Sequence, residues 1–399
     1  MVTRTHLYGI ASGAIFIGIV TACLWPFGAP KNQVSWLEQC PGLRFGEYGT
    51  IISRGPLLPS SGLSRDGWTL ELWLRPGEAY QDGTIVAFYD PYRARGFSLR
   101  QANADLVACE RLWSTNLPAG GRTVDVLRVF RGRPRIFLTL ASGVDGTRIF
   151  VNGKLVRLDS DFQISRDDFS GRMVVGNSPV DNDGWSGDLP GLAFYDSALT
   201  DSEVFRNYSS WTEAGRPDIT REQSLAALFL FDEGSGSVVH DEVESAADLY
   251  VPPRYLELHH AVLKRPWDEY RADLDYWKSA VINIGGFVPL GFFIYAYLFL
   301  GLQRPRAALT TILVGGLLSL TVEILQSFLP TRDSGMTDII TNSLGTALGA
   351  GLCRCTSIVC EALRNNRNLH VRRFAGLFTP GTAEPAVMAE RVSIEHYRI

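Results

Sequence analysis

Cysteine is scarce in this chain, and its placement does not form the framework of a small disulfide-stapled domain. The 399 residues include 6 cysteines, and most fall in or beside long apolar runs. A free cysteine in such a place packs as a small hydrophobic residue. We therefore interpret four of the six as packing residues: Cys23, Cys353, Cys355 and Cys360.

A strong excess of charge of either sign is also missing. The formal net charge is −4 at pH 7, and the lysine and arginine residues gather at the ends of segments. Proteins that bind nucleic acid need a basic patch or stripe, so we expect no nucleic acid partner.

Residue sets that carry enzymatic chemistry are absent as well. No nucleophile with an adjacent base is evident, and the apolar runs hold no histidine. A glycosidase needs a pair of carboxylates, whereas Glu71 stands alone between Leu70 and Leu72. We interpret Glu71 as a solvent-facing strand residue. The sequence favours a protein that is not an enzyme, and an intramembrane acid–base enzyme stays open as the alternative.

Four long apolar runs are present, over residues 7–28, 279–302, 307–329 and 336–360. A helix needs about 20 such residues to cross a bilayer. Hydrophobic residues make up 46% of the chain, which is high for a soluble protein. We predict four transmembrane helices, with a globular segment between the first and the second.

Arginine residues at the ends of these runs predict the orientation. Arg4 precedes the first run, and Arg304 and Arg306 lie between the second and the third. A further group lies at the end of the fourth run and beyond it: Arg354, Arg364, Arg367, Arg372 and Arg373. The positive-inside rule places all of them in the cytoplasm. We predict cytoplasmic N- and C-termini, with residues 30–278 and the turn at 330–335 outside.

The first run has a second interpretation, as a cleaved lipoprotein signal. Residues 20–23, Val-Thr-Ala-Cys, resemble the site at which residues 1–22 would be removed and Cys23 acylated. The apolar character nevertheless continues past the cysteine to Phe27, and Trp25 suits a membrane interface. We favour an uncleaved transmembrane helix over 1–28 and leave cleavage open.

The segment from about 45 to 215 alternates with period two. Residues 69–76 form a strand pattern that ends at a proline, and Asn152-Gly153 supplies the two positive φ angles of a hairpin turn. Many short strands at this spacing predict a β-sandwich. Residues 224–250 predict one more strand that connects back to it.

Three phrases in this segment carry a resemblance: GWTLELWLRP, TRIFVNGKLV and GDLPGLAFYDSALTDSEV. In this order they resemble the LamG or concanavalin A-like lectin/glucanase family. The resemblance implies an all-β jelly-roll sandwich that binds a glycan or protein partner, in some members with calcium at the loop rim.

The loop before Trp185 offers oxygen ligands for such a calcium ion: Asp181, Asn182 and Asp183. Calcium takes six to eight oxygen ligands, which is too many for this loop alone. We therefore favour a solvated loop with a half-buried tryptophan, and no cofactor.

Cys40 and Cys109 both lie in the predicted exported segment, where oxidation is possible. A disulfide between them and two separate thiols both stay open.

Polar residues recur near one end of three predicted helices. The second span carries Asn283, Phe287, Pro289 and Gly291; the third ends with Glu323 and Gln326; the fourth begins with Asp338, Asn342, Gly345 and Gly349. Spacings of three and four place Asn283, Phe287 and Gly291 on one face of the second span, and place each of the other two sets on one face of its helix. Pro289 should kink the second span, and the glycines let helices approach closely. At about 1.5 Å of rise per residue, the polar groups lie within about 10 Å of the outer surface. Arg332 in the turn is placed to pair with Glu323 or Asp338.

Such residues inside membrane segments indicate a functional site by default. We predict a polar pocket that opens to the outer leaflet. The alternative is that these side chains only hold the helices together by hydrogen bonds.

The phrases NIxxFxPxGF and ExxQ, followed by Arg332, Asp338, Asn342, Gly345 and Gly349, resemble the VanZ-like membrane family. The resemblance is close over 279–358 and loose over 1–28, and it implies a bacterial inner-membrane protein linked to the cell envelope and to teicoplanin resistance. Gly335 departs from the pattern, because such proteins often carry Asp or Ser there.

Our leading hypothesis is a multi-pass membrane protein whose exported sandwich binds an envelope glycan or protein, while its polar pocket engages a membrane lipid or lipid-linked envelope precursor. An intramembrane enzyme acting on a lipid phosphate and a membrane-tethered adaptor with an inert helical hairpin are the alternatives.

The predicted domains are a transmembrane helix at 1–28, the sandwich with its connector at 33–250, an interfacial collar rich in aromatic and charged residues at 251–278, three transmembrane helices at 279–358 and a cytoplasmic tail at 359–399.

Overall fold

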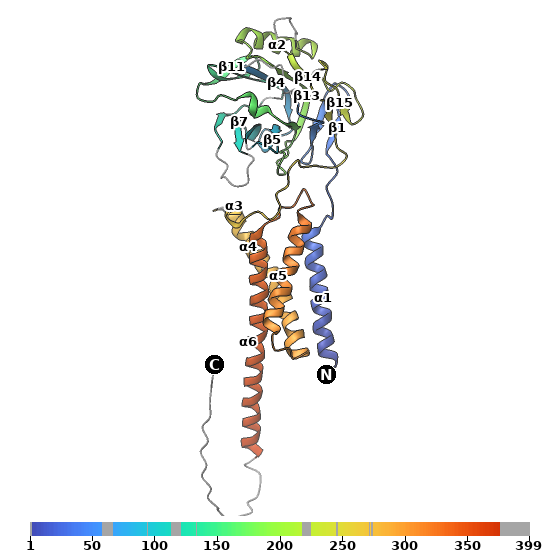
Figure 1. Ribbon diagram of the computed structural model, residues 1–399, viewed down its shortest axis with the longest axis vertical. Helices are drawn as coiled ribbons and strands as arrows, with labels where there is room; N and C mark the ends of the chain where they lie inside the picture. Colours follow the sequence, from blue (N-terminus) through green and yellow to red (C-terminus); the bar gives the residue numbers. More distant parts are fainter. Residues whose placement is uncertain are drawn as a thin grey trace, which may run out of the picture.

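The computed structural model describes residues 2–57, 67–93, 95–112, 121–132, 134–217, 225–244, 246–270, 272 and 274–375. A β-sandwich lies at one end, and a bundle of long helices extends from it (Figure 1). The N-terminus lies at the end of the bundle that is far from the sandwich (Figure 1).

The first sheet of the sandwich pairs neighbouring strands in antiparallel register. Its strand order is β1 (Val34–Trp36), β2 (Leu43–Phe45), β13 (Gly187–Tyr195), β4 (Gly67–Pro76), β9 (Ile136–Gly143), β10 (Gly146–Val151) and β11 (Lys154–Asp159), and β14 (Leu225–Phe229) also pairs with β13. The hairpin between β10 and β11 turns at Asn152 and Gly153, whose φ angles of 51° and 72° confirm the predicted turn.

The second sheet is antiparallel as well. Its order is β15 (Val238–Val239), β16 (Leu249–Tyr250), β3 (Ile51–Ser53), β12 (Arg172–Val175), β5 (Gln81–Tyr89), β6 (Arg95–Asn103), β7 (Asp105–Leu112) and β8 (Thr123–Val126). The predicted all-β sandwich is therefore confirmed.

Aromatic side chains from both sheets fill the space between them. Trp68 of β4 packs edge-on against Phe169 with 4.3 Å between ring centroids, and Phe169 in turn contacts Phe88 of β5 and Phe194 of β13. Phe169 lies in the short helix η1 (Arg166–Phe169). All four rings are buried, so the hydrophobic effect and their edge-to-face contacts hold the two sheets together.

A helix covers the outer face of the first sheet and overturns our interpretation of Glu71. Helix α2 (Asp201–Ala214) begins at a Thr200 capping box and ends at Gly215, whose φ is 72°. Its Asn207 donates to both Glu71 carboxylate oxygens at 3.2 and 3.3 Å, and Tyr195 donates its hydroxyl at 3.0 Å. Glu71 is therefore buried rather than exposed, and burial raises its pKa to about 8.

The remaining elements are mostly helices. They are α1 (Val2–Leu24), α3 (Pro266–Glu269), α4 (Leu274–Tyr295), the π-helical turn η2 (Ala296–Gly301), α5 (Ala307–Gln326) and α6 (Met336–Ala375). In the part of the chain that the structure describes, four helical segments are long and apolar enough to cross a membrane: Arg4–Leu24, Tyr276–Gly301, Ala307–Gln326 and Met336–Leu363. Helix α6 continues into the predicted tail as far as Ala375, and residues 376–399 lie outside the described residues.

Glycine permits the close packing of α4 on α6. A methyl group at Gly345 would overlap the carbonyl oxygen of Ile284, and one at Gly349 would overlap that of Val288. On α4, a methyl group at Gly291 would overlap the carbonyl oxygen of Thr346. Backbone therefore meets backbone along this interface, as small residues allow in membranes.

The burial of Glu71 makes the stability of the sandwich depend on pH. Because the folded state favours the neutral acid, the free energy of unfolding should fall as the pH rises from about 4.5 to about 8, by at most about 1.4 kcal/mol per pH unit. Denaturation of the full chain in detergent, followed by tryptophan fluorescence from pH 4.5 to 8, measures this slope. Glu71→Gln should make it shallower, and Glu213→Gln, on the exposed face of α2, should not. An unchanged slope in Glu71→Gln would contradict the assignment.

The helix interface allows a matched comparison of two glycines. Gly349→Ala should destabilise the detergent-solubilised chain by about 1–3 kcal/mol, because the added methyl group overpacks the contact with α4. Gly351→Ala, two residues further along the same helix and in open space, should leave stability unchanged or raise it by up to about 1 kcal/mol, because alanine is the better helix former. Thermal unfolding measures both, and equal effects would argue against the glycine contact.

Candidate functional site

The polar residues of the predicted membrane site lie at the end of the helix bundle that faces the sandwich. The Glu323 side chain, only 1% exposed, accepts a hydrogen bond at 2.8 Å from the backbone N–H of Gly335. Asn283 of α4 lies next to the Asp338 carboxylate of α6. Asn342 of α6 donates to the Ser319 hydroxyl of α5 at 2.9 Å. Side chains from three helices therefore meet at this end.

Two of the predicted residues face α1 instead. Gln326 donates its side-chain amide to the Cys23 carbonyl at 3.0 Å, and Arg332 donates to the Trp25 carbonyl at 2.7 Å. These carbonyls lie at the C-terminal end of α1, where a helix leaves acceptors without intrahelical partners. The predicted pairing of Arg332 with Glu323 or Asp338 is wrong for this structure, in which all three residues are described and no such ion pair forms.

The collar contributes residues that the sequence did not reveal. The backbone of Lys264 pairs with the turn on both sides, accepting from Met336 and donating to Ser334, each at 2.9 Å. The Lys264 ammonium also binds the Asp333 carboxylate at 2.6 Å. The collar is thus joined to the turn between α5 and α6 as a short parallel bridge.

Glu269 of α3 caps the start of α6. Its carboxylate accepts from the backbone N–H of Thr337 at 3.0 Å, and a carboxylate is favourable at a helix N-terminus. A methyl group at Gly335 would overlap the Glu269 carboxylate. The glycine at position 335, where the family often carries Asp or Ser, was therefore the one feature of the sequence that pointed to another side chain packed at this position.

Carboxylates and amide oxygens make this cluster rich in hydrogen-bond acceptors. Glu323 and Asp338 both lie near Glu269 and Asp333. The side-chain oxygens of Gln326 and Asn342 are buried and have no hydrogen-bond partner among the described residues. Because buried polar atoms are nearly always satisfied, these two oxygens leave acceptor capacity for the polar part of another molecule.

The collar meets the sandwich at Tyr255, whose hydroxyl lies 3.1 Å from the Asp181 carbonyl. Glu257 accepts from the Tyr255 hydroxyl at 3.1 Å and lies 2.7 Å from His260 Nδ1. Burial raises the pKa of Glu257 above its usual range. The backbone of Leu258 donates to the Pro179 carbonyl at 2.9 Å, which is a second hydrogen bond between the collar and the sandwich.

The residues of the predicted calcium loop are committed to protein partners. Both oxygens of Asp183 are held by Arg100 at 2.9 Å, and Asn182 accepts from Asn177 at 3.2 Å. No group of three or more metal-ligating side chains occurs in the described part of the chain. These oxygens do not fit a calcium site as they stand. Trp185, predicted to be half-buried, is 1% exposed and donates to Gln101.

Cys40 and Cys109 do not form a disulfide. Cys40 lies in the loop between β1 and β2 of the first sheet, whereas Cys109 lies on β7 of the second sheet. Sequence alone cannot reveal this separation, because it depends on which sheet each strand joins.

The fold and the helices define a membrane protein that joins a concanavalin A-like sandwich to a helical membrane unit. Comparison with protein families finds VanZ/LLP1 over residues 225–359 and the Concanavalin A-like lectin/glucanases superfamily over residues 53–205. This chain therefore contains a VanZ domain and a LamG-type domain, which confirms both resemblances. Among curated proteins, none matches the chain.

Solved structures resemble the sandwich only distantly. A protein from Bacteroides ovatus described as carbohydrate binding is 13% identical, with a TM-score of 0.35, and the match covers 58% of this chain and 62% of that one. The binding domain of botulinum neurotoxin serotype D/C is 14% identical, with a TM-score of 0.33, and the match covers 45% of this chain and 46% of that one. The binding domain of Paraclostridial Mosquitocidal Protein 1 is 12% identical, with a TM-score of 0.30, and the match covers 46% and 47%. We draw no functional conclusion from likenesses of this size.

The cap on α6 predicts a measurable role for Glu269. Glu269→Ala should lower the free energy of unfolding by about 1 kcal/mol, because the Thr337 N–H loses its acceptor at the membrane boundary. Glu269→Gln keeps an acceptor oxygen and should lose less. The neighbouring exposed residue provides the control, since Asp268→Ala should have little effect. Thermal unfolding in detergent measures the three variants, and equal stability of Glu269→Ala and Asp268→Ala would contradict the cap.

Proposed function

We propose that this chain is a multi-pass protein of the bacterial inner membrane that binds an amphiphilic envelope molecule. Its sandwich would recognise the saccharide part of that molecule, and the polar cluster would engage the part that enters the membrane. The observation that carries the proposal is position. The cluster of Glu323, Asp338 and Asn342 lies at the C-terminal end of α5 and the start of α6. Figure 1 shows that the start of α6 and the nearby α3 are at the end of the bundle that faces the sandwich.

Charge supports an outward-facing sandwich. Gly301 packs against Thr5, so the loop that carries Arg304 and Arg306 lies beside the start of α1. These arginines are at the end of the bundle opposite the sandwich, which the positive-inside rule assigns to the cytoplasm. The polar cluster then lies in the outer leaflet, where lipid-linked wall precursors and the lipid tails of glycopeptide antibiotics are found. Tolerance to such antibiotics is the cellular effect we propose.

The adaptor hypothesis remains the second candidate, and one observation favours it. Four of the predicted pocket residues already have protein partners: Glu323, Gln326, Arg332 and Asn342. A cluster that only holds the helices together would need no ligand. Lipid binding by the cluster distinguishes the two candidates.

Lipid co-purification provides that test. Glu323→Gln keeps an acceptor for Gly335 but removes the charge, and Asn342→Ala removes a buried oxygen without a partner. Each should reduce several-fold the lipid-linked species that co-purify with the full chain, measured by mass spectrometry, and should raise the sensitivity of the host to glycopeptides. Thr321→Val, on the exposed face of α5, is the control.

The outcome decides between the candidates if the variants elute as the folded chain does. Unchanged lipid content together with unchanged drug sensitivity would refute engagement by the cluster and would favour the adaptor. Loss of lipid in Thr321→Val as well would indicate annular lipid rather than a bound ligand.

A further inference from the structure

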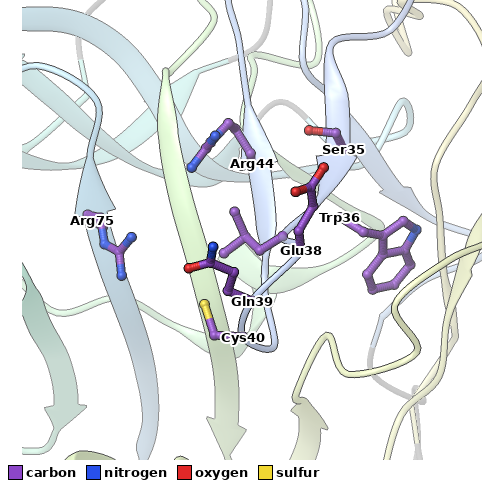
Figure 2. A pocket seen from close by; sticks show the side chains of 8 residues that line it. Ser35, Trp36, Glu38, Gln39, Cys40, Arg44 and Arg75 are labelled. Carbon is purple, nitrogen blue, oxygen red and sulfur yellow. The ribbon is translucent and has the colours of Figure 1, made fainter.

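A polar pocket with a volume of about 480 Å³ lies on the first sheet of the sandwich, beside the loop that joins β1 to β2. This volume falls within the range of about 300–1,000 Å³ that is typical of small-molecule sites. Figure 2 shows Arg75 at one side of the pocket and Trp36 at the other, with Glu38 and Gln39 of the loop between them.

A row of polar side chains crosses four neighbouring strands at the pocket, and three of its members line it: Ser35, Arg44 and Arg75. Ser35 of β1 pairs in register with Arg44 of β2, which pairs with Asp188 of β13, which pairs with Arg75 of β4. Leu43 and Phe45, on either side of Arg44, point into the core. Since side chains alternate across a strand, the row lies on the outer face of the sheet.

A buried carboxylate orients both guanidinium groups. Asp188 is 4% exposed and accepts from Arg44 at 2.8 and 3.2 Å, and from Arg75 at 3.2 Å. The side chains of Arg44 and Arg75 are 61% and 35% exposed. Each guanidinium has five N–H donors in a rigid plane, so groups held in this way present further donors to the pocket in a preorganised geometry.

The loop that forms the other wall is held in place by backbone bonds. Leu37 donates to the Gly42 carbonyl at 3.0 Å, and Gly42 donates to the Phe231 carbonyl at 2.8 Å. A side chain at Gly42, whose φ is 138°, would collide with Leu37 and Pro190. The loop therefore presents Glu38 and Gln39 to solvent from a constrained backbone.

The chemistry of the lining matches an uncharged polyhydroxylated ligand. The two guanidinium groups are balanced by the carboxylates of Asp188 and Glu38, so the site offers donors and acceptors without a net charge. Trp36 contributes no ring face to this side of the sheet, because it pairs with Leu43 and packs against the core, and its indole N–H is held by the Gly236 carbonyl at 3.1 Å. A sugar unit carries hydroxyl groups that both donate and accept, which is the feature that this lining complements.

We propose that this pocket binds an uncharged saccharide unit, through Glu38, Gln39 and the guanidinium groups of Arg44 and Arg75. The inference rests on the proposed function of the sandwich as a saccharide-binding domain, and it assigns that function to a particular face and to a class of ligand.

The test uses the full chain in phospholipid nanodiscs, because detergents with sugar headgroups would compete. The probes are neutral oligosaccharides of glucose, galactose, mannose and N-acetylglucosamine, together with uronic acid counterparts. Glu38→Ala and Arg44→Ala should each weaken the binding of a neutral oligosaccharide at least ten-fold. Arg157→Ala is the matched control, because Arg157 is also an exposed arginine beside a carboxylate, on β11 at the opposite edge of the same sheet.

Glu38 lies in an exposed loop, so its variant tests the pocket even if Arg44→Ala misfolds. Binding of neutral sugars that depends little on salt and is lost in Glu38→Ala but not in Arg157→Ala supports the proposal. Binding that persists in Glu38→Ala and in folded Arg44→Ala would overturn the pocket and leave the proposed function standing. Binding restricted to uronic acids and weakened by salt would overturn the ligand class. If the unmodified chain binds no saccharide, the pocket and the saccharide-binding role both fall.

Discussion

Backbone groups at the ends of membrane helices must find partners in the protein, because the bilayer core supplies no water. This chain meets that requirement at one boundary. The carbonyls at the end of α1 receive Gln326 and Arg332, and the first N–H groups around the start of α6 are bound by Glu323 and Glu269. The polar side chains of the membrane domain are thus first of all partners of exposed helix ends. A ligand of the cluster can bind only to acceptors that these hydrogen bonds leave unused, such as the side-chain oxygens of Gln326 and Asn342.

The parts of the fold that could be predicted are those set by local pattern. Apolar runs of membrane length yielded all four helices, and Asn152-Gly153 yielded the β10–β11 hairpin. Features that depend on distant segments could not be found in the same way. Glu71 looked exposed because its strand alternates, but α2 covers that face and Asn207 and Tyr195 satisfy the carboxylate.

The candidate site divides along the same line. Helical spacing led us to expect Glu323, Asp338 and Asn342 at one end of the bundle, where the end of α5 and the start of α6 lie together. It could not reveal that Arg332 turns toward α1 or that Glu269 comes from the collar, since both depend on how separate elements dock. The pocket on the sandwich was missed for a related reason. Arg44, Asp188 and Arg75 are far apart in the sequence, and only the order of β2, β13 and β4 brings them into one row.

Gly335 stands immediately before α6, at the position where Ser and Asp normally cap a helix. Here Glu269 of α3 caps the helix instead, and the glycine at position 335 leaves the space that the Glu269 carboxylate occupies. The last membrane helix consequently has no cap of its own. A fragment that begins at residue 279 would lack Glu269 and Lys264 and would leave the start of α6 without its cap, so a membrane unit that keeps this cap has to extend upstream to include the collar.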